Sequence, residues 1–393
     1  MNIDERKTYF STELLAWYRR HHRDLPWRRS RNPYYIWVSE IMLQQTRVDT
    51  VIPYFERFIG RFPTVEALAL APEEDVLKLW EGLGYYSRAR NLQAAVKEVH
   101  ERYDGVVPSE KTDISSLKGV GPYTSGAILS IAYNKPEPAV DGNVMRVLSR
   151  YFIIEEDIMK ISTRTLMEKL AKELIPEGAA GDFNQALMEL GATVCTPRSP
   201  YCLTCPVREG CAGREEGREE TLPVKKKAKP PRPEKRLVAL IEGTGELAGR
   251  ILIRQRPQEG LLARMWELPH VEVDKLPPVH TGEDVHNMEG SAILGERIVL
   301  APNAALERLE AHLAEEGIAI EPQERLMDAE HTFSHIHWEM QVYRCRIKSG
   351  WSGKEQLPQL TPYHYRWLAP DELPQYAFPN VFLRIMKQYR DTR

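Results

Sequence analysis

The sequence has no apolar run long enough to cross a bilayer, and it opens with the charged residues MNIDERKTYF rather than an apolar leader. A membrane helix needs about 20 apolar residues, and a secretory signal needs an apolar core. We therefore expect a soluble, cytosolic protein without a membrane partner. Internal repeats and low-complexity tracts are also lacking. The 393 residues are enough for two or three domains with separate cores.

A large excess of charge of one sign is missing too, since the net charge is -3. This excludes a chain that coats nucleic acid over its whole surface, although local basic patches remain informative. Residues 1–35 hold eight Lys or Arg against four acids. Residues 223–236, PVKKKAKPPRPEKR, hold seven against Glu234 alone. The second stretch combines Pro and Lys without apolar periodicity, which predicts an extended connector between domains.

The two sides of this connector differ in their hydrophobic pattern. Apolar residues recur at helical spacing up to about residue 212, which predicts a helical domain. Beyond the connector an α+β domain is predicted, with two strands, a helix and a third strand at 237–243, 250–256, 304–316 and 336–342. Residues 271–300, rich in Pro, Gly, His and Asp, are predicted to include a long loop.

Cysteine is scarce, with five in the chain, yet four of them fall within one short segment: Cys195, Cys202, Cys205 and Cys211. Soft thiolates in this arrangement suit an iron-sulfur cluster or zinc. Two disulfides so close together would be strained. Structural zinc sites commonly pair two short knuckles, and only Cys202 and Cys205 form one here. The spacing favours a cluster, and zinc stays open as the alternative.

The segment LKGVGPYTSGAILSIAY, residues 117–133, places Gly119 and Gly121 in a turn and opens a helix at Pro122. This pattern is typical of a helix-hairpin-helix motif. Its glycine amides and the helix N-terminus are suited to binding a phosphate of DNA. The plainer interpretation is a turn between two helices.

Two acids have neighbours that make them candidates for catalysis. Glu40 lies among apolar residues in YYIWVSEIMLQQTRVDTVIPYF, and we expect it near the start of a helix that ends near Pro53. A carboxylate in such surroundings is costly unless it is paired or protonated, and a protonated carboxyl group suits general-acid chemistry. Asp141 and Asn143, in PAVDGNVMRVLSR, open another helix. Both acids also fit ordinary first-turn or capping roles, and nothing local brings them together.

A family resemblance connects these segments. The blocks SEIMLQQTRV, EGLGYYSRARNL, LKGVGPYTSGAI, AVDGNVMRVLSR and FNQALMELGATVC, followed by the Cys quartet, resemble MutY-type adenine DNA glycosylases of the endonuclease III superfamily. The second half resembles that family's Nudix-like domain, which reads 8-oxoguanine. The implied architecture is a helical catalytic domain, a basic connector and a Nudix-like α+β domain, at 1–222, 223–236 and 237–393. The hairpin falls at 115–133 and the iron-sulfur loop at 195–211.

The resemblance also implies a reaction and a cofactor. Glu40 would be the general acid and Asp141 its ionised partner in hydrolysing adenine from double-stranded DNA, where adenine opposes 8-oxoguanine or guanine and is flipped from the duplex. Tyr123 and Asn143 would support these carboxylates, with Arg28 and Gln185 near the adenine. The four thiolates would hold one [4Fe-4S] cluster. The implied protein is a monomer associated with the nucleoid.

Further residues match the family's DNA contacts. Gln45, Leu83 and Tyr85 align with residues that wedge into the duplex around 8-oxoguanine. The family's lesion-reading segment would be Phe333, Ser334 and His335. Tyr123 stands where bifunctional relatives carry a Schiff-base lysine, so the resemblance implies a monofunctional enzyme. Read without the resemblance, GLGYY is a turn with a packed aromatic pair.

The second half departs from active Nudix hydrolases. The best match to their metal-binding motif, EAHLAEEGI at Glu310–Ile318, keeps Glu315, Gly317 and Ile318 but loses most acids. We therefore expect no hydrolysis of nucleotide diphosphates. Two competing hypotheses are an endonuclease III-like lyase, disfavoured by Tyr123, and a non-catalytic redox sensor, which would need neither Glu40 nor Asp141. We expect the cluster to act as a staple that presents Arg198 and Arg208 to phosphate.

Overall fold

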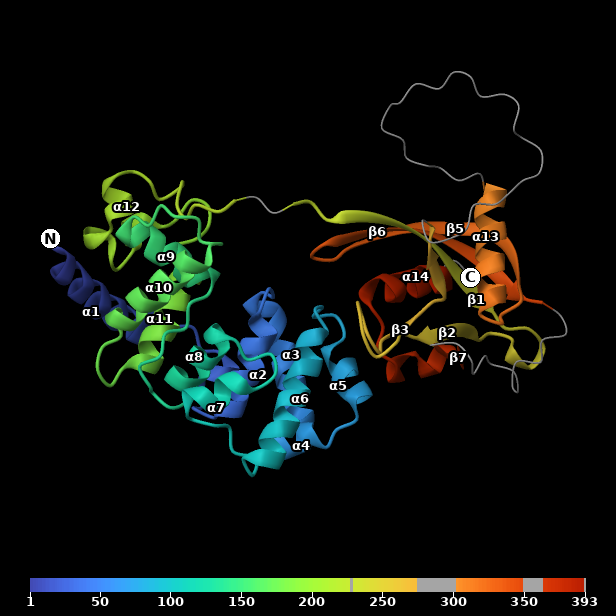
Figure 1. Ribbon diagram of the computed structural model, residues 1–393, viewed down its shortest axis with the longest axis horizontal. Coiled ribbons are helices and arrows are strands. Elements are labelled where there is room, and N and C mark those ends of the chain that lie inside the picture. The colour runs from blue at the N-terminus through green and yellow to red at the C-terminus, as the bar shows by residue number, and fades with distance from the viewer. Residues whose placement is uncertain (227–228, 274–301, 349–362, 392–393) are drawn as a thin grey trace, which may run out of the picture. The chain divides into compact units, whose positions relative to one another are not determined.

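The computed structural model describes residues 1–226, 229–273, 302–348 and 363–391 and divides them into two compact units, Met1–Ala228 and Lys229–Arg393 (Figure 1). The first unit is helical, and the second is built on a single sheet. No helix within these ranges is long and apolar enough to cross a membrane.

The first unit consists of two groups of helices. In one group, α1 (Ile3–His21) packs against the later helices α9 (Gly142–Phe152), α10 (Ile161–Leu174) and α11 (Ala180–Thr193) around a shared apolar core. The short α12 (Ala212–Glu215) adjoins α9. The other group contains α2 (Pro33–Leu43), α3 (Val48–Arg61), α4 (Val65–Ala69), α5 (Glu73–Trp80), α6 (Ser87–Arg102), α7 (Lys111–Ser116) and α8 (Pro122–Ile131). Contacts of α8 with both α2 and α11 join the groups.

The helix that carries Glu40 ends earlier than the sequence predicts. α2 stops at Leu43 and α3 begins at Val48, so Pro53 lies inside α3 and Glu40 lies near the end of α2 rather than at its start. The break has a long-range cause. Gln45 adopts φ of 59°, which interrupts the helix, and the distant Arg88 guanidinium donates to the carbonyl oxygens of Ile41, Met42 and Gln44 at its end.

The described residues of the second unit form a mixed, seven-stranded sheet with the order β3-β2-β1-β6-β5, to which β4 adds beside β1 and β7 beside β2. Strands β1 and β6 are parallel, and the other pairs are antiparallel. The strands are β1 (Arg232–Glu242), β2 (Ile251–Gln255), β3 (Trp266–Glu267), β4 (His270–Glu272), β5 (Ile320–Thr332), β6 (Ile336–Ile347) and β7 (His364–Leu368). The predicted strands and helix of this half are confirmed.

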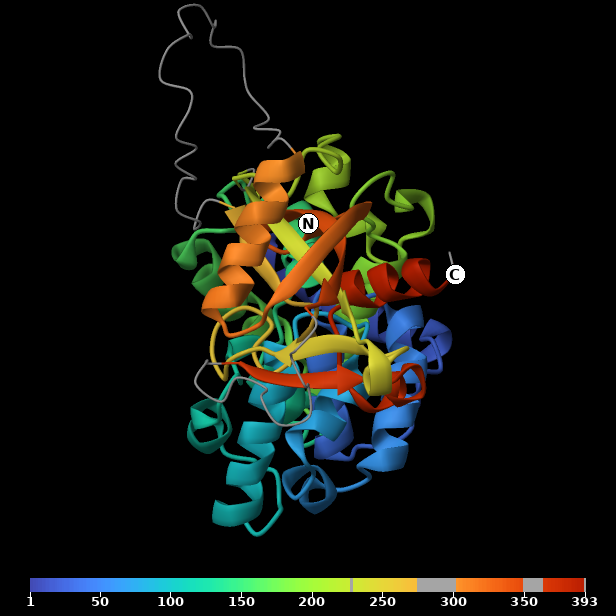
Figure 2. The same cartoon turned by 90° about the vertical axis from the view of Figure 1, so that its right-hand side faces the viewer.

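Both faces of the central strand β1 are buried, which explains its continuous apolar run. Leu237, Ala239 and Ile241 pack in the same core as α13 (Pro302–Glu315), whereas Val238 and Leu240 pack in the same core as α14 (Asn380–Asp391). In the described part of this unit, one helix therefore covers each side of the sheet (Figure 2). Most of the predicted loop at 271–300 lies outside the described residues.

The predicted connector 223–236 is too long at its C-terminal end. Residues 232–236 are the first part of β1 and pair with β6 in parallel, from Arg232 opposite Ile336 onward. Composition suggested a solvated segment because this stretch combines Pro and Lys without apolar periodicity. The strand forms nevertheless because Glu234 is buried and accepts hydrogen bonds from neighbouring cations.

Candidate active site

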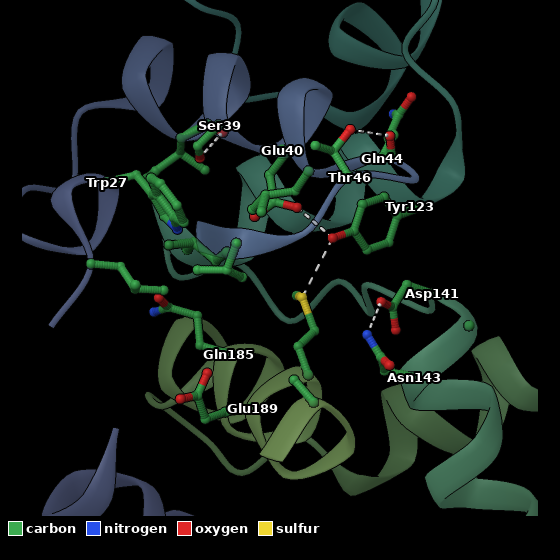
Figure 3. Close-up of a pocket in the computed structure, with 18 of the residues that line it drawn as sticks. Trp27, Ser39, Glu40, Gln44, Thr46, Tyr123, Asp141, Asn143, Gln185 and Glu189 are labelled. Atoms are coloured by element: carbon green, nitrogen blue, oxygen red, sulfur yellow. Dashed lines mark hydrogen bonds between the residues drawn. The ribbon is translucent and has the colours of Figure 1, made fainter. Parts of the chain in front are cut away.

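A pocket of about 620 Å³ lies between the two groups of helices (Figure 3). Its walls come from the turn Pro26–Arg28, from α2 and the loop after it, and from α8, α9 and α11. Seven residues singled out in the sequence line it: Arg28, Glu40, Gln45, Tyr123, Asp141, Asn143 and Gln185. The fold therefore gathers side chains that no local pattern placed together.

Glu40 is almost fully enclosed, with 5% of its surface exposed. It projects from α2 toward α8, where the Tyr123 hydroxyl donates a hydrogen bond to its carboxyl group (Figure 3). Burial raises the pKa of Glu40 to about 7, and the nearby charge of Asp141 acts in the same direction. A protonated carboxyl group is thus available near neutral pH.

Tyr123 owes its position to the predicted hairpin, which the structure places between α7 and α8. Gly119 has φ of 77°, and a Cβ there would meet the Asn91 side chain at 2.8 Å, so glycine is required. Gly121 has φ of -92° and open space around it. Its conformation does not itself require glycine. Pro122 then begins α8 and Tyr123 follows in its first turn, directed into the pocket.

Asp141 is the N-cap of α9, as the plainer interpretation of the sequence held. Its Oδ1 accepts the Val144 amide at 2.8 Å, and its Oδ2 accepts the Asn143 side-chain amide at 2.9 Å. Burial raises the pKa of Asp141, while these hydrogen bonds oppose that rise. The positive end of α9 also favours the ionised form. The capping role and a place in the pocket are therefore compatible.

Glu189 is a pocket residue that the sequence analysis missed. Its carboxylate, 2% exposed, is bound by Arg23 at 2.7 Å and by Arg28 at 2.9 Å. Burial alone would raise its pKa, but the two guanidinium groups overcome this and lower the pKa to about 2. An acid among Leu187, Met188 and Leu190 is the same signal that identified Glu40, so the pattern was available.

Comparisons with known proteins agree with this geometry. The model of the HhH-GPD superfamily base excision DNA repair proteins matches residues 38–177, and that of the NUDIX domain matches residues 244–388. The human adenine DNA glycosylase is 36% identical over 98% of this chain and 74% of its own length. The Arabidopsis thaliana adenine DNA glycosylase is 40% identical over 66% of this chain and 46% of its own length. The chain belongs to the adenine DNA glycosylase family. A solved thermostable thymine-DNA glycosylase is also similar, with a TM-score of 0.50 and 30% identity over 54% of this chain and 98% of that one.

In this DNA glycosylase of base excision repair, Gln45, Leu83 and Tyr85, for which the family resemblance implies contacts with the duplex, lie on two loops that Arg88 joins. Leu83 is buried, whereas Tyr85 is 42% exposed with φ of 49°. Arg88 holds both loops, donating to Gln44 O at 2.5 Å after α2 and to Gly84 O at 3.1 Å before α6. Burial lowers the pKa of Arg88 to about 10, still high enough to keep it charged.

The four cysteines of the glycosylase line one cavity, together with Arg150, Arg208 and Arg214. Burial raises the pKa of Cys202, that of Cys211 to about 11 and that of Cys205 to about 12. The Arg150 guanidinium donates to Cys195 Sγ at 3.3 Å and to Thr196 O at 2.7 Å. Partly buried thiols next to a cation are a donor set that a metal centre would deprotonate.

Helix α9 connects this cysteine loop to the pocket. Arg146 donates to Asn143 Oδ1 at 2.8 Å and to Cys195 O at 2.8 Å, and Asn143 in turn donates to Asp141. One continuous hydrogen-bonded path thus joins the cysteine loop to the carboxylate at the N-terminus of α9.

Phe333, Ser334 and His335 lie in the second unit, at the turn between β5 and β6. Ser334 and His335 are exposed at the tip. The Phe333 amide donates to Ile336 O at 2.7 Å and closes the turn.

The buried Glu40 makes stability depend on pH in an unusual direction. Its folded pKa of about 7 exceeds the ordinary value of 4.5, so the folded protein binds a proton that the unfolded chain has lost between these values. Stability from this group should fall as pH rises from about 4.5 through 7, by about 3 kcal/mol. Glu40→Gln should be more stable than the parent at pH 8, with the difference shrinking by pH 5. Urea unfolding of both proteins at pH 5 and pH 8 measures this difference in the free energy of unfolding.

The control for that experiment is Glu110→Gln, an acid of the same unit that is paired with Lys135 at the surface. Its stability difference from the parent should not grow with pH. A Glu40→Gln protein that is less stable than the parent at pH 8 would contradict the assigned burial.

Removing the Arg88 side chain should destabilise the glycosylase. Arg88→Met leaves carbonyl groups of two loops without a donor, and we expect a loss of about 3 kcal/mol in urea unfolding. Arg102→Met, on the exposed end of the same helix, should change stability by less than about 0.5 kcal/mol. Equal losses of stability in the two variants would contradict the conclusion that hydrogen bonds from Arg88 hold the two loops in place.

Proposed function

We propose that this glycosylase hydrolyses the N-glycosidic bond of adenine paired with 8-oxoguanine or guanine, with Glu40 as general acid and Asp141 as the ionised partner. The observation that carries the proposal is the pairing of two unlike carboxyl groups in one pocket. Glu40 is buried beside Tyr123 and has a pKa of about 7. Asp141 is bound by amides at a helix N-terminus.

The reaction needs one carboxyl group in its protonated form and the other in its ionised form. Adenine is a poor leaving group as an anion, so the proton of Glu40 passes to N7 of the base as the bond from C1′ to N9 breaks. The sugar then carries positive charge, which the Asp141 carboxylate stabilises or captures transiently. Water supplies a hydroxyl group to C1′, and its proton returns to the carboxylate of Glu40. Asn143 and Tyr123 hold the two acids in place.

We propose that the wall of the pocket that carries Arg28 and Gln185 recognises the base. Adenine reaches this pocket only when its nucleotide is flipped from the duplex. Arg28, fixed by Glu189, and the Gln185 amide offer hydrogen-bonding groups there. Because the Glu189 carboxylate offsets one of the two positive charges of Arg23 and Arg28, the wall presents donors with only a small net positive charge.

A monofunctional reaction follows from the residue at the hairpin. Tyr123 hydrogen-bonds to Glu40 and carries no amine, so it forms no Schiff base. Gln45 and Tyr85, on the loops that Arg88 holds, are proposed to enter the duplex, and Ser334 is proposed to hydrogen-bond 8-oxoguanine. Leu83, which is buried, is proposed to support the loop that carries Tyr85. The second unit is proposed to read the lesion rather than hydrolyse nucleotides. Its helix α13 retains Glu315, but the adjacent Glu316 is engaged by Arg254, His312 and Tyr365.

We further propose that Cys195, Cys202, Cys205 and Cys211 hold a [4Fe-4S] cluster. The four thiols line one cavity, which supports a single metal centre shared by all of them. The spacing of the cysteines and the family resemblance favour a cluster over zinc. When bound, the group would fix a loop that has only short 3-10 turns of its own, Cys202–Thr204 and Arg208–Gly210.

Both carboxyl groups should be essential for adenine release. Glu40→Gln and Asp141→Asn should each lower the single-turnover rate by about a thousandfold, because each removes a group used in the transition state. In the parent the rate should fall as pH rises through about 7, where Glu40 loses its proton. The assay follows abasic sites in duplexes with adenine opposite 8-oxoguanine, guanine or thymine.

Glu110→Gln again serves as the control and should keep the parental rate and pH profile. Release that survives both pocket substitutions would refute the mechanism. No preference for 8-oxoguanine and guanine over thymine would refute the substrate.

The cluster should matter for folding and DNA affinity before it matters for chemistry. Cys202→Ser should lower iron content, visible absorbance and affinity for duplex DNA, while the rate at saturating DNA changes less. Cys345→Ala, at a buried thiol of the second unit, should keep the iron. Full iron content and affinity in Cys202→Ser would contradict the ligand set.

A further inference from the structure

The end of the connector is hydrogen-bonded directly to the turn Phe333–His335. The Arg232 amide donates to His335 O at 2.9 Å, and parallel pairing with β6 continues from this point. The turn is therefore flanked on one side by β5 and on the other by the first residues of β1. We call these flanking segments the frame of the turn. The first residues of β1, which composition assigned to a solvated linker, belong to this frame.

Glu234, the single acid of this basic stretch, lies at the centre of the frame. It stands opposite Trp338 in the β1–β6 register and is 4% exposed. Its Oε2 accepts hydrogen bonds from Trp338 Nε1 at 3.1 Å and from Arg236 at 2.6 Å, and its Oε1 accepts one from Arg232 at 2.5 Å. Three donors therefore fix this carboxylate.

Trp338 in turn supports the turn. The indole is fully buried, and the Phe333 ring packs edge-on against it with 4.8 Å between ring centroids. The Arg236 guanidinium lies 4.3 Å from the centroid of the same indole. Arg236 also contacts His270 Nδ1 at 3.1 Å, and the His270 ring packs against Trp338 at 5.3 Å. The orientation of Trp338 is thus set by the Glu234 carboxylate at its N–H and by cationic and aromatic groups around its ring.

We propose that Glu234 is a positioning residue for lesion recognition: it orients Trp338, which holds Phe333 and so sets the place of Ser334 and His335. This rests on the proposed function, in which that turn contacts 8-oxoguanine. Glu234 touches neither the lesion nor the adenine. Its effect is therefore expected in the discrimination between 8-oxoguanine and guanine, rather than in the chemical step at Glu40.

The test compares single-turnover adenine release opposite 8-oxoguanine and opposite guanine, using the full chain. In Glu234→Ala the ratio of the two rates should fall about tenfold, the effect of losing one hydrogen bond to a charged group. Release opposite guanine should change less than about twofold, since one lost bond in the second unit leaves the pocket intact. Glu234→Gln, whose amide oxygen still accepts the indole N–H, should retain most of the ratio.

A second variant separates positioning from folding. Trp338→Phe keeps an aromatic ring under Phe333 but removes the N–H that Glu234 binds, so it should also lower the ratio. Glu321→Gln is the matched control because it removes an acid from the far end of the same β5–β6 hairpin, where Glu321 is exposed. Its ratio should equal that of the parent. Near-UV circular dichroism checks that each protein is folded.

The outcomes are distinguishable. If the parent itself shows no preference for 8-oxoguanine, the proposed function fails. If the parent shows the preference and folded Glu234→Ala retains it, or loses both rates equally, the positioning role is overturned. If Glu234→Ala does not fold, Trp338→Phe decides: a lowered ratio supports the role, and an unchanged ratio overturns it.

Discussion

The burial of one carboxyl group, that of Glu40, is the constraint on which the site depends. A carboxylate enclosed by apolar side chains loses its hydration, and the group responds by holding its proton to about pH 7. The apolar surroundings of Glu40 cause this rise in pKa, whereas the hydrogen bond from the Tyr123 hydroxyl opposes it by stabilising the carboxylate. The Arg28 guanidinium is close enough to oppose the shift, and its pairing with Glu189 limits that effect.

Burial also raises the pKa of Asp141, but the same fold surrounds this carboxylate with hydrogen-bond donors that oppose the rise. It lies at the beginning of α9, where amide groups point at its oxygens, whereas Glu40 lies near the end of α2, away from such donors. Two acids of similar intrinsic strength are thereby separated in function by their positions on helices. Because α9 also holds the cysteine loop through Arg146 and Arg150, the placement of Asp141 and the order of that loop depend on the same helix.

Local patterns predicted much of this architecture, and the reasons for their limits are physical. The strand around Leu240, the hairpin and the Cys quartet follow from neighbouring residues, so sequence sufficed. The end of α2 depends on Arg88, which is distant in the chain. The composition around Glu234 indicated a linker because local sequence does not show that Glu234 pairs with the distant Trp338. Glu40 and Asp141 were found one at a time. Only tertiary packing, or family resemblance, places them in one pocket.

Buried arginines explain how irregular segments keep their shape in the first unit. A loop exposes carbonyl groups that no helix or strand satisfies, and the fork of a guanidinium supplies several donors at fixed angles. Arg88 binds carbonyl oxygens of two loops, and Arg150 binds those of Thr196, Pro197 and Leu222. A lysine would provide one ammonium group at a single point and could not span these acceptors. The positive charges retained in this way also lie in a domain whose substrate is a polyanion, so the groups that shape its loops add to the attraction for DNA.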